Sequence, residues 1–137
     1  MGSLGIDTWG QSNTLKVAVY AATGRIPKGR TVRFTGHSKS GAYEVDVPGI
    51  GRRSHALVTD CPSGHISPTE PGYALAFGPL VEAEAAASLA TDDDVTPQAD
   101  GTLDRSSSGD RRCVGTAITP AMPGTSFLML LRWSGRP

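Results

Sequence analysis

The apolar runs of this chain are short, and turn residues separate them. Between Leu80 and Trp133 the apolar runs are broken by Ala-Asp-Gly at 99–101, Ser-Gly-Asp at 108–110 and Pro-Gly at 123–124. Short runs with such boundaries are typical of strands joined by hairpins. The 17 glycines and 10 prolines among 137 residues also favour many turns over long helices. The sequence therefore predicts an all-β fold, a small barrel or sandwich with at most one or two short helices.

Period-2 alternation predicts the individual strands. Tyr43, Val45 and Val47 alternate with two acidic residues, so we expect these three side chains to point inward. Val32 and Phe34 alternate with polar residues in the same way, whereas GHSKSG at 36–41 predicts a turn. The expected strands are residues 15–20, 31–35, 43–47, 55–59, 73–77, 94–97, 112–119 and 126–133.

Residues 80–90 allow two interpretations. Ala, Glu and Leu dominate 82–90 and are strong helix formers. The first six residues, LVEAEA, alternate as a strand does. We favour a strand followed by a short helical turn.

The first 14 residues differ from the rest of the chain. They are rich in Gly and Ser and carry three separated apolar residues, Leu4, Ile6 and Trp9. Such a segment is too short to build a core of its own. We expect residues 1–14 to form an extended arm, and residues 15–137 to form a single β-rich domain.

The two cysteines, Cys61 and Cys113, are expected to be free. The N-terminus lacks the basic start and apolar core of a secretory signal, and no apolar run is long enough to span a membrane. Synthesis in the cytosol keeps thiols reduced. Cys61 and His65 form one tight pair, whereas structural zinc needs two. The Asp92–Asp94 triad lacks the alternating oxygens of a calcium loop. No metal or cofactor is therefore expected.

Charge is balanced overall but segregated along the chain. Thirteen basic and thirteen acidic residues give a net charge of zero, which disfavours a general electrostatic grip on nucleic acid. Residues 25–53 are mainly basic and residues 82–110 mainly acidic. This asymmetry suits contact between copies of the chain or docking on a charged shell, and solvated loop faces explain it equally well. Arg52 and Arg53 are candidates for such contact.

One enzymatic alternative stays open. A cysteine could act as a nucleophile with His55 or His65 as its base, and Asp60 could orient that base. Pro62, directly after Cys61, argues against a nucleophile presented at a helix N-terminus. The alternative would be a small Cys/His hydrolase.

Three motifs carry a family resemblance. DGT at 100–102, GDRRCVGTAIT at 109–119 and PGTSFLMLL at 123–131 resemble the small capsid decoration (cement) proteins of tailed bacteriophages. The likeness covers roughly Pro27 to Arg132 and is closest from Leu80 onward. It implies a β-rich protein that binds the outer face of a capsid, often as a trimer near three-fold positions. Relative to simple members, residues 36–78 look like a long insertion.

These observations together predict a structural virion protein rather than an enzyme. It would be made in the host cytoplasm, bind the capsid exterior and stabilise the shell by bridging neighbouring capsomers. The expected partners are the major capsid protein and other copies of the chain in a trimer, with no direct nucleic acid and no membrane. Another virion component, such as a tail or head-fibre base protein, is the alternative within that class. The candidate interface residues are Leu4, Ile6, Trp9, Arg52, Arg53 and Trp133.

The arm provides a first testable prediction. Burying Leu4, Ile6 and Trp9 would remove apolar surface worth several kcal/mol at about 25 cal/mol per Å², before ordering costs. Deleting residues 1–14 should leave a folded domain that binds capsids weakly, and Trp9→Ala should lose about 2 kcal/mol. Co-sedimentation with undecorated capsids measures both. Saturation by the truncated protein at the wild-type concentration would show that the arm is not the tether.

Overall fold

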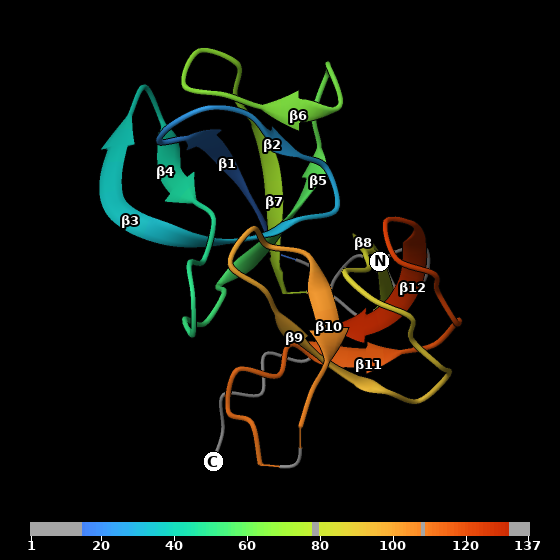
Figure 1. Cartoon of the computed structure of the whole chain (residues 1–137). Coiled ribbons are helices and arrows are strands. Elements are labelled where there is room, and N and C mark those ends of the chain that lie inside the picture. The colour runs from blue at the N-terminus through green and yellow to red at the C-terminus, as the bar shows by residue number, and fades with distance from the viewer. Residues whose placement is uncertain (1–14, 78–79, 108, 132–137) are drawn as a thin grey trace, which may run out of the picture.

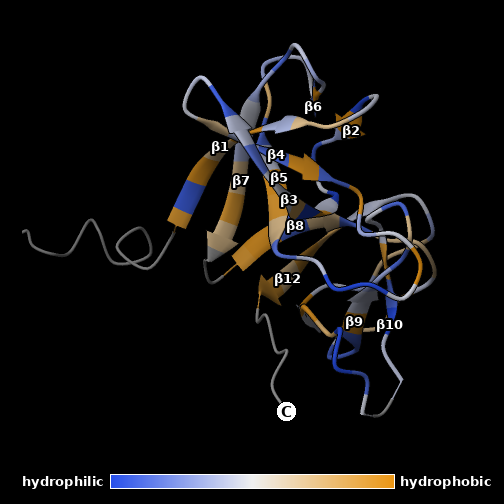
Figure 2. Ribbon diagram, turned by 90° about the vertical axis from the view of Figure 1, so that its left-hand side faces the viewer, coloured by the Kyte–Doolittle hydropathy of each residue, from blue (hydrophilic) through white to orange (hydrophobic). Residues whose placement is uncertain are grey.

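The computed structural model describes residues 15–77, 80–107 and 109–131, and these form twelve strands. No helix occurs among the described residues. Figure 1 shows a barrel above a second, smaller sheet. Hydrophobic residues lie mainly along the strands and hydrophilic residues along many of the connecting loops (Figure 2). The predicted all-β fold is confirmed, whereas the expected arm at residues 1–14 lies outside the described residues.

The first unit is a closed five-stranded barrel in the order β1-β4-β3-β5-β7. β1 pairs with β4 in parallel, and the other neighbours are antiparallel. Closure leaves the barrel without a free edge that could pair with another chain. The strands are β1 (Leu15–Ala21), β3 (Thr31–Lys39), β4 (Ala42–Asp46), β5 (Ala56–Asp60) and β7 (Gly72–Phe77).

Small β-branched and Ala side chains fill the barrel. Val19, Val32, Val45 and Val58 are fully buried in its core. One end is covered by β2 (Ile26–Pro27) and β6 (His65–Ile66), which pair with each other (Figure 1). Ile26 and Ile66 belong to the same core, so this short ribbon closes that end of the barrel.

The second unit is an open five-stranded sheet in the order β10-β9-β11-β12-β8. Its inner face carries the other core, in which Val95, Leu103, Phe127 and Met129 are buried. Its strands are β8 (Leu80–Glu84), β9 (Asp94–Pro97), β10 (Leu103–Arg105), β11 (Gly115–Ala117) and β12 (Ser126–Leu131).

Apolar side chains of the barrel complete the core of the sheet. Leu57 of β5 and Leu75 of β7 are buried in the cluster that the second sheet forms. The core of the second sheet is therefore closed only by the barrel, whereas the barrel core contains residues of the first unit and the β2–β6 ribbon alone.

A seam of polar contacts surrounds this shared core. The Thr31 backbone N–H donates to Gly101 O at 2.9 Å, and the Glu84 N–H donates to Gly29 O at 3.0 Å. Arg30 donates from Nε to Glu84 Oε1 at 2.8 Å. The basic segment and the acidic segment of the sequence thus neutralise part of each other's charge within one chain.

Two predicted side-chain orientations are wrong. Tyr43 is about half exposed, because the β3–β4 pairing shifts between Phe34 and Ser38 and Tyr43 lies beyond that irregularity. Its ring packs edge-on against Phe34 at 6.1 Å between centroids. Thr31, on the face expected to be polar and outward, is fully buried because the second sheet covers it.

Several element predictions also need correction. The turn expected at 36–41 is mostly strand, since β3 continues to Lys39. The strand at 80–84 is confirmed, but no helical turn follows it in the described residues. Residues 36–78, which looked like an insertion, are part of the barrel itself. Part of β3 and the whole of β4, β5 and β7 come from them.

Gly101 tests the seam. Its φ is +90°, and a Cβ added there would overlap Thr31 O. Gly41 in the β3–β4 turn has φ +81° with nothing within 4 Å of such a Cβ. Gly41→Ala should cost about 1 kcal/mol for the left-handed backbone alone, whereas Gly101→Ala should cost about 1–3 kcal/mol more from the overlap. Denaturant unfolding measures both, and equal losses would contradict a tight seam.

Candidate functional site

The loop that connects β4 to β5, residues 47–55, builds the candidate site. Gly49 and Gly51 have φ of +84° and +71°, and the Arg52 N–H donates to Gly49 O at 3.4 Å to close a turn. The Gly49 N–H donates to Ala99 O at 3.1 Å, so the loop is tied to the second sheet. Pro48 is buried beneath the turn. Ile50 at the tip is consequently held out in solvent, with 90% of its surface exposed.

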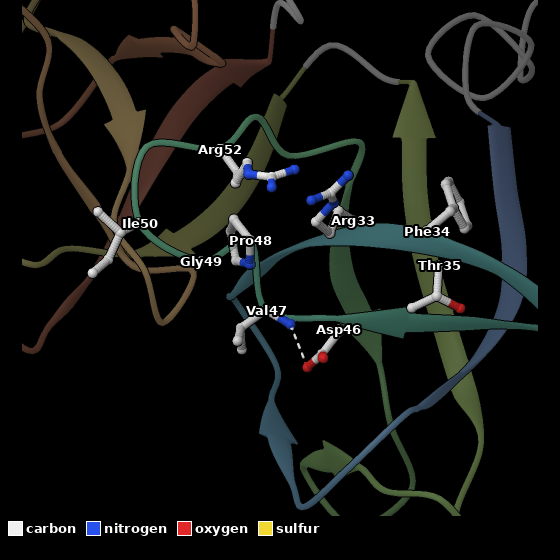
Figure 3. Close-up of a pocket in the computed structure, with 9 residues that line it drawn as sticks. All are labelled: Arg33, Phe34, Thr35, Asp46, Val47, Pro48, Gly49, Ile50 and Arg52. Atoms are coloured by element: carbon white, nitrogen blue, oxygen red, sulfur yellow. Dashed lines mark hydrogen bonds between the residues drawn. The ribbon is translucent and has the colours of Figure 1, made fainter.

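A hollow of about 500 Å³ lies between this loop and strands β3 and β4. Figure 3 shows the guanidinium groups of Arg33 and Arg52 pointing toward each other across it. The Asp46 carboxylate turns instead toward the backbone and accepts the Val47 N–H at 2.8 Å. Neither arginine forms an ion pair with any residue in the described ranges. Two cations therefore share one open hollow.

A second hollow of about 360 Å³ begins where the loop enters β5. Arg53 and Arg111 line it and form no ion pair within the described part of the chain. Arg112 also lines it, but its guanidinium binds Asp110 at 2.9 Å. That bond lowers the pKa of Asp110 and raises the pKa of Arg112. We call Arg33, Arg52, Arg53 and Arg111 the arginine surface.

His55 stands between the two hollows. Its ring stacks on Phe34 with centroids 5.9 Å apart and an interplanar angle of 12°. Its Nδ1 accepts the Phe34 N–H at 3.0 Å, which requires a ring unprotonated at that nitrogen. Partial burial, and next the charge of Arg33, lower the pKa of His55. A neutral imidazole therefore supports β3 beside Arg33.

The candidate interface residues fall into two groups. Arg52 and Arg53 are exposed, and they line different hollows. Leu4, Ile6, Trp9 and Trp133 lie outside the described residues.

Sequence reasoning missed Arg33, Arg111 and Ile50. For Arg33 a signal existed, since it occupies the outward face of the alternating run at 31–35. Arg111 is 58 positions further along the chain than Arg53, and no local pattern connects the two.

The remaining charges are mostly paired within the chain. Arg105 lies 3.4 Å from Asp93, and Lys16 lies 2.6 Å from Asp60. The Asp93 carboxylate also accepts the Ala90 N–H at 2.8 Å and so holds a turn. Arg112 binds its near neighbour Asp110 at 2.9 Å. Arg25, Lys28 and Lys39 also form no ion pair in the described ranges, but only the arginine surface brings such cations together in pairs within a hollow.

Cys113 and His55 line the same hollow, but the Cys113 thiol donates to Gly115 O at 3.4 Å, and His55 Nδ1 accepts the Phe34 N–H at 3.0 Å. Neither cysteine is in a disulfide within the described residues. Burial, and next the charge of Asp60, raise the pKa of the Cys61 thiol, which favours the unreactive protonated form. His65 is bound to Glu70 at 2.9 Å, and that bond lowers the pKa of Glu70. Within the described ranges, no three His, Cys, Asp or Glu side chains are grouped to hold a metal ion.

The comparisons with known proteins include a likeness to a solved structure. No protein-family model and no curated protein matches the sequence. Among solved structures, the head fiber gp8.5 N base of bacteriophage phi29 has a TM-score of 0.68 and 11% sequence identity. The match covers 90% of this chain and 98% of that chain. At this identity the likeness concerns the fold, and it extends over both the barrel and the second sheet. No helix in the described residues is long and apolar enough to cross a membrane.

The geometry of His55 predicts how stability depends on pH. Its pKa in the folded state lies below the value of about 6.5 expected for the unfolded chain. Between those two pKa values the unfolded chain binds more protons, so the free energy of unfolding should fall as pH drops below about 6.5. His55→Phe keeps the ring stacking and should flatten that part of the curve. Denaturant unfolding from pH 5 to 8 gives the curve, and NMR titration gives the pKa; a value above 6.5 would contradict the Phe34 bond.

Proposed function

We propose that this chain is a structural protein of a tailed-bacteriophage virion that docks on the outer surface of the head and stabilises the shell. One observation carries the proposal. The chain has the fold of a complete bacteriophage head-fibre base module, since it covers 98% of that solved chain. The sequence motifs that resemble capsid decoration proteins point to the same location independently. The proposed partners are the major capsid protein and further copies of this chain in a trimer.

The surface of the molecule suits adhesion. Leu80, Ile118 and Leu128 lie on the outer face of the second sheet with 36–54% of their surface exposed. The β8–β12 register places Leu128 opposite Glu82, so apolar and acidic side chains share that face. Both hollows of the arginine surface are open rather than enclosed. Flat apolar strips and open charged hollows suit contact with another protein surface.

Binding alone explains how such a protein would stabilise a shell. A protein that binds the assembled shell and not its separated parts lowers the free energy of the intact state by mass action. A copy that bridges two capsomers also adds interface area at the junction. Many copies act on one shell, so modest affinity for each copy suffices.

The solved neighbour favours a second candidate function, the base of a head fibre. A fibre base needs only to hold its fibre on the head, whereas a decoration protein must bridge capsomers. The two functions share a docking site and differ in their effect on the shell. Occupied shells that resist heat no better than bare shells would indicate the fibre base.

Co-sedimentation tests the shared part of the proposal. Purified protein should sediment with capsids of its own phage and saturate at a fixed number of copies per shell. Saturated shells should then release their DNA at a higher temperature than bare shells. A lysozyme of similar mass controls for trapping. No saturable co-sedimentation at any ionic strength would refute docking on the head.

A further inference from the structure

We propose that the arginine surface is a docking site for a carboxylate-rich protein segment that presents Asp or Glu beside an apolar side chain. This inference rests on the proposed function, in which that segment belongs to the outer face of the capsid protein. It adds the chemistry of the contact and names the residues that make it.

Unpaired positive charge is the first reason. Arg33 and Arg52 line one hollow and point toward each other (Figure 3). Guanidinium groups stay charged at every physiological pH, so the two repel unless an anion lies between them. The nearby Asp46 carboxylate accepts the Val47 N–H and forms no ion pair with either arginine. Arg53 and Arg111 extend the positive surface into the neighbouring hollow.

The surroundings of these arginines favour carboxylate over phosphate. The planar guanidinium binds either group with two parallel hydrogen bonds, so its own chemistry does not decide. Ile50, at the lip of the hollow, is 90% exposed and offers an apolar contact that a nucleic acid backbone does not use. Bases would need an aromatic ring to stack on. The nearest ring, Phe34, already packs against His55 on one side and Tyr43 at its edge.

The hollow is also held in shape before any partner arrives. Its loop is fixed by the Gly49–Ala99 bond and by the buried Pro48. Arg33 lies on β3 of a closed barrel, supported by the stacked His55. A preformed site loses little conformational entropy on binding. Because the barrel has no free edge, recognition there must come from side chains rather than from strand addition.

Binding of a synthetic probe peptide to the full chain tests the inference without capsids. The probe is a fluorescein-labelled twelve-residue peptide of Glu and Asp with two Leu, and its Gln/Asn counterpart is the control. Fluorescence anisotropy at low salt should show saturable binding of the acidic probe only. Raising the salt concentration should weaken that binding, since exposed charges are screened.

Matched variants locate the site. Arg52→Gln should weaken binding about fivefold, and Arg33→Gln with Arg52→Gln at least about tenfold, from about 1 kcal/mol per guanidinium contact. Arg25→Gln removes the same charge from the exposed turn before β2 and should change binding less than about twofold. Ile50→Ser should weaken binding more than Met122→Ser, an equally polar change at another exposed apolar residue. Thermal unfolding confirms that each variant is folded.

Three results would overturn the inference. They are equal losses for Arg52→Gln and Arg25→Gln, equal binding of the acidic and amide probes, and tighter binding of a polyphosphate probe of the same charge through Arg33 and Arg52. None of them concerns capsids. Saturable co-sedimentation by the Arg33→Gln and Arg52→Gln double variant would place the docking site elsewhere while docking itself stands. Absence of co-sedimentation by the wild type would refute the proposed function instead.

Discussion

A buried contact between Thr31 and Gly101 holds the second sheet against the barrel. Gly101 O accepts both the backbone N–H of Thr31 and its hydroxyl, at 2.9 and 3.0 Å. The Thr31 hydroxyl in turn accepts a hydrogen bond from Ser54 Oγ at 2.8 Å. A buried hydroxyl without partners would destabilise the fold by about 1–3 kcal/mol. These bonds therefore fix where the second sheet meets the barrel, and Leu57 and Leu75 reach the sheet's core only in that arrangement.

The arginine surface is a consequence of the same seam. Ser54 follows Arg52 and Arg53 in the loop, and its hydroxyl donates to the Thr31 hydroxyl. Toward the other end of the loop, the Gly49 N–H donates to Ala99 O. Hydrogen bonds therefore hold the loop to both the barrel and the second sheet. Charge is arranged along the seam as well. Arg30 is satisfied there by Glu84, whereas the four members of the arginine surface form no ion pair within the described ranges. Pairing inside the molecule thus defines what remains outside for a partner.

The chemistry of the exposed groups explains why we propose adhesion rather than catalysis. An enzyme of the Cys/His type needs a thiolate beside an available histidine. Burial raises the pKa of Cys61, His65 is bound to Glu70, and the Cys113 thiol donates to Gly115 O. The histidine nearest to the arginines, His55, uses Nδ1 to hold β3 in place. The surface instead presents arginines without ion pairs among the described residues, the exposed apolar side chain of Ile50, and a loop whose backbone is held by hydrogen bonds. Those properties serve recognition of a complementary surface.

The fold class and most strand positions could be predicted from the sequence, because alternation and turn chemistry are properties of neighbouring residues. The sequence did not determine which faces are covered. Thr31 looks like an outward residue and is buried, and Tyr43 looks like an inward residue and is exposed. The tertiary structure places Arg33 and Arg52 in one hollow and Arg53 and Arg111 in another, and it pairs Arg30 with Glu84. No local sequence pattern predicts these groupings. Those groupings depend on strand register and on the packing of one sheet against another, which join residues tens of positions apart.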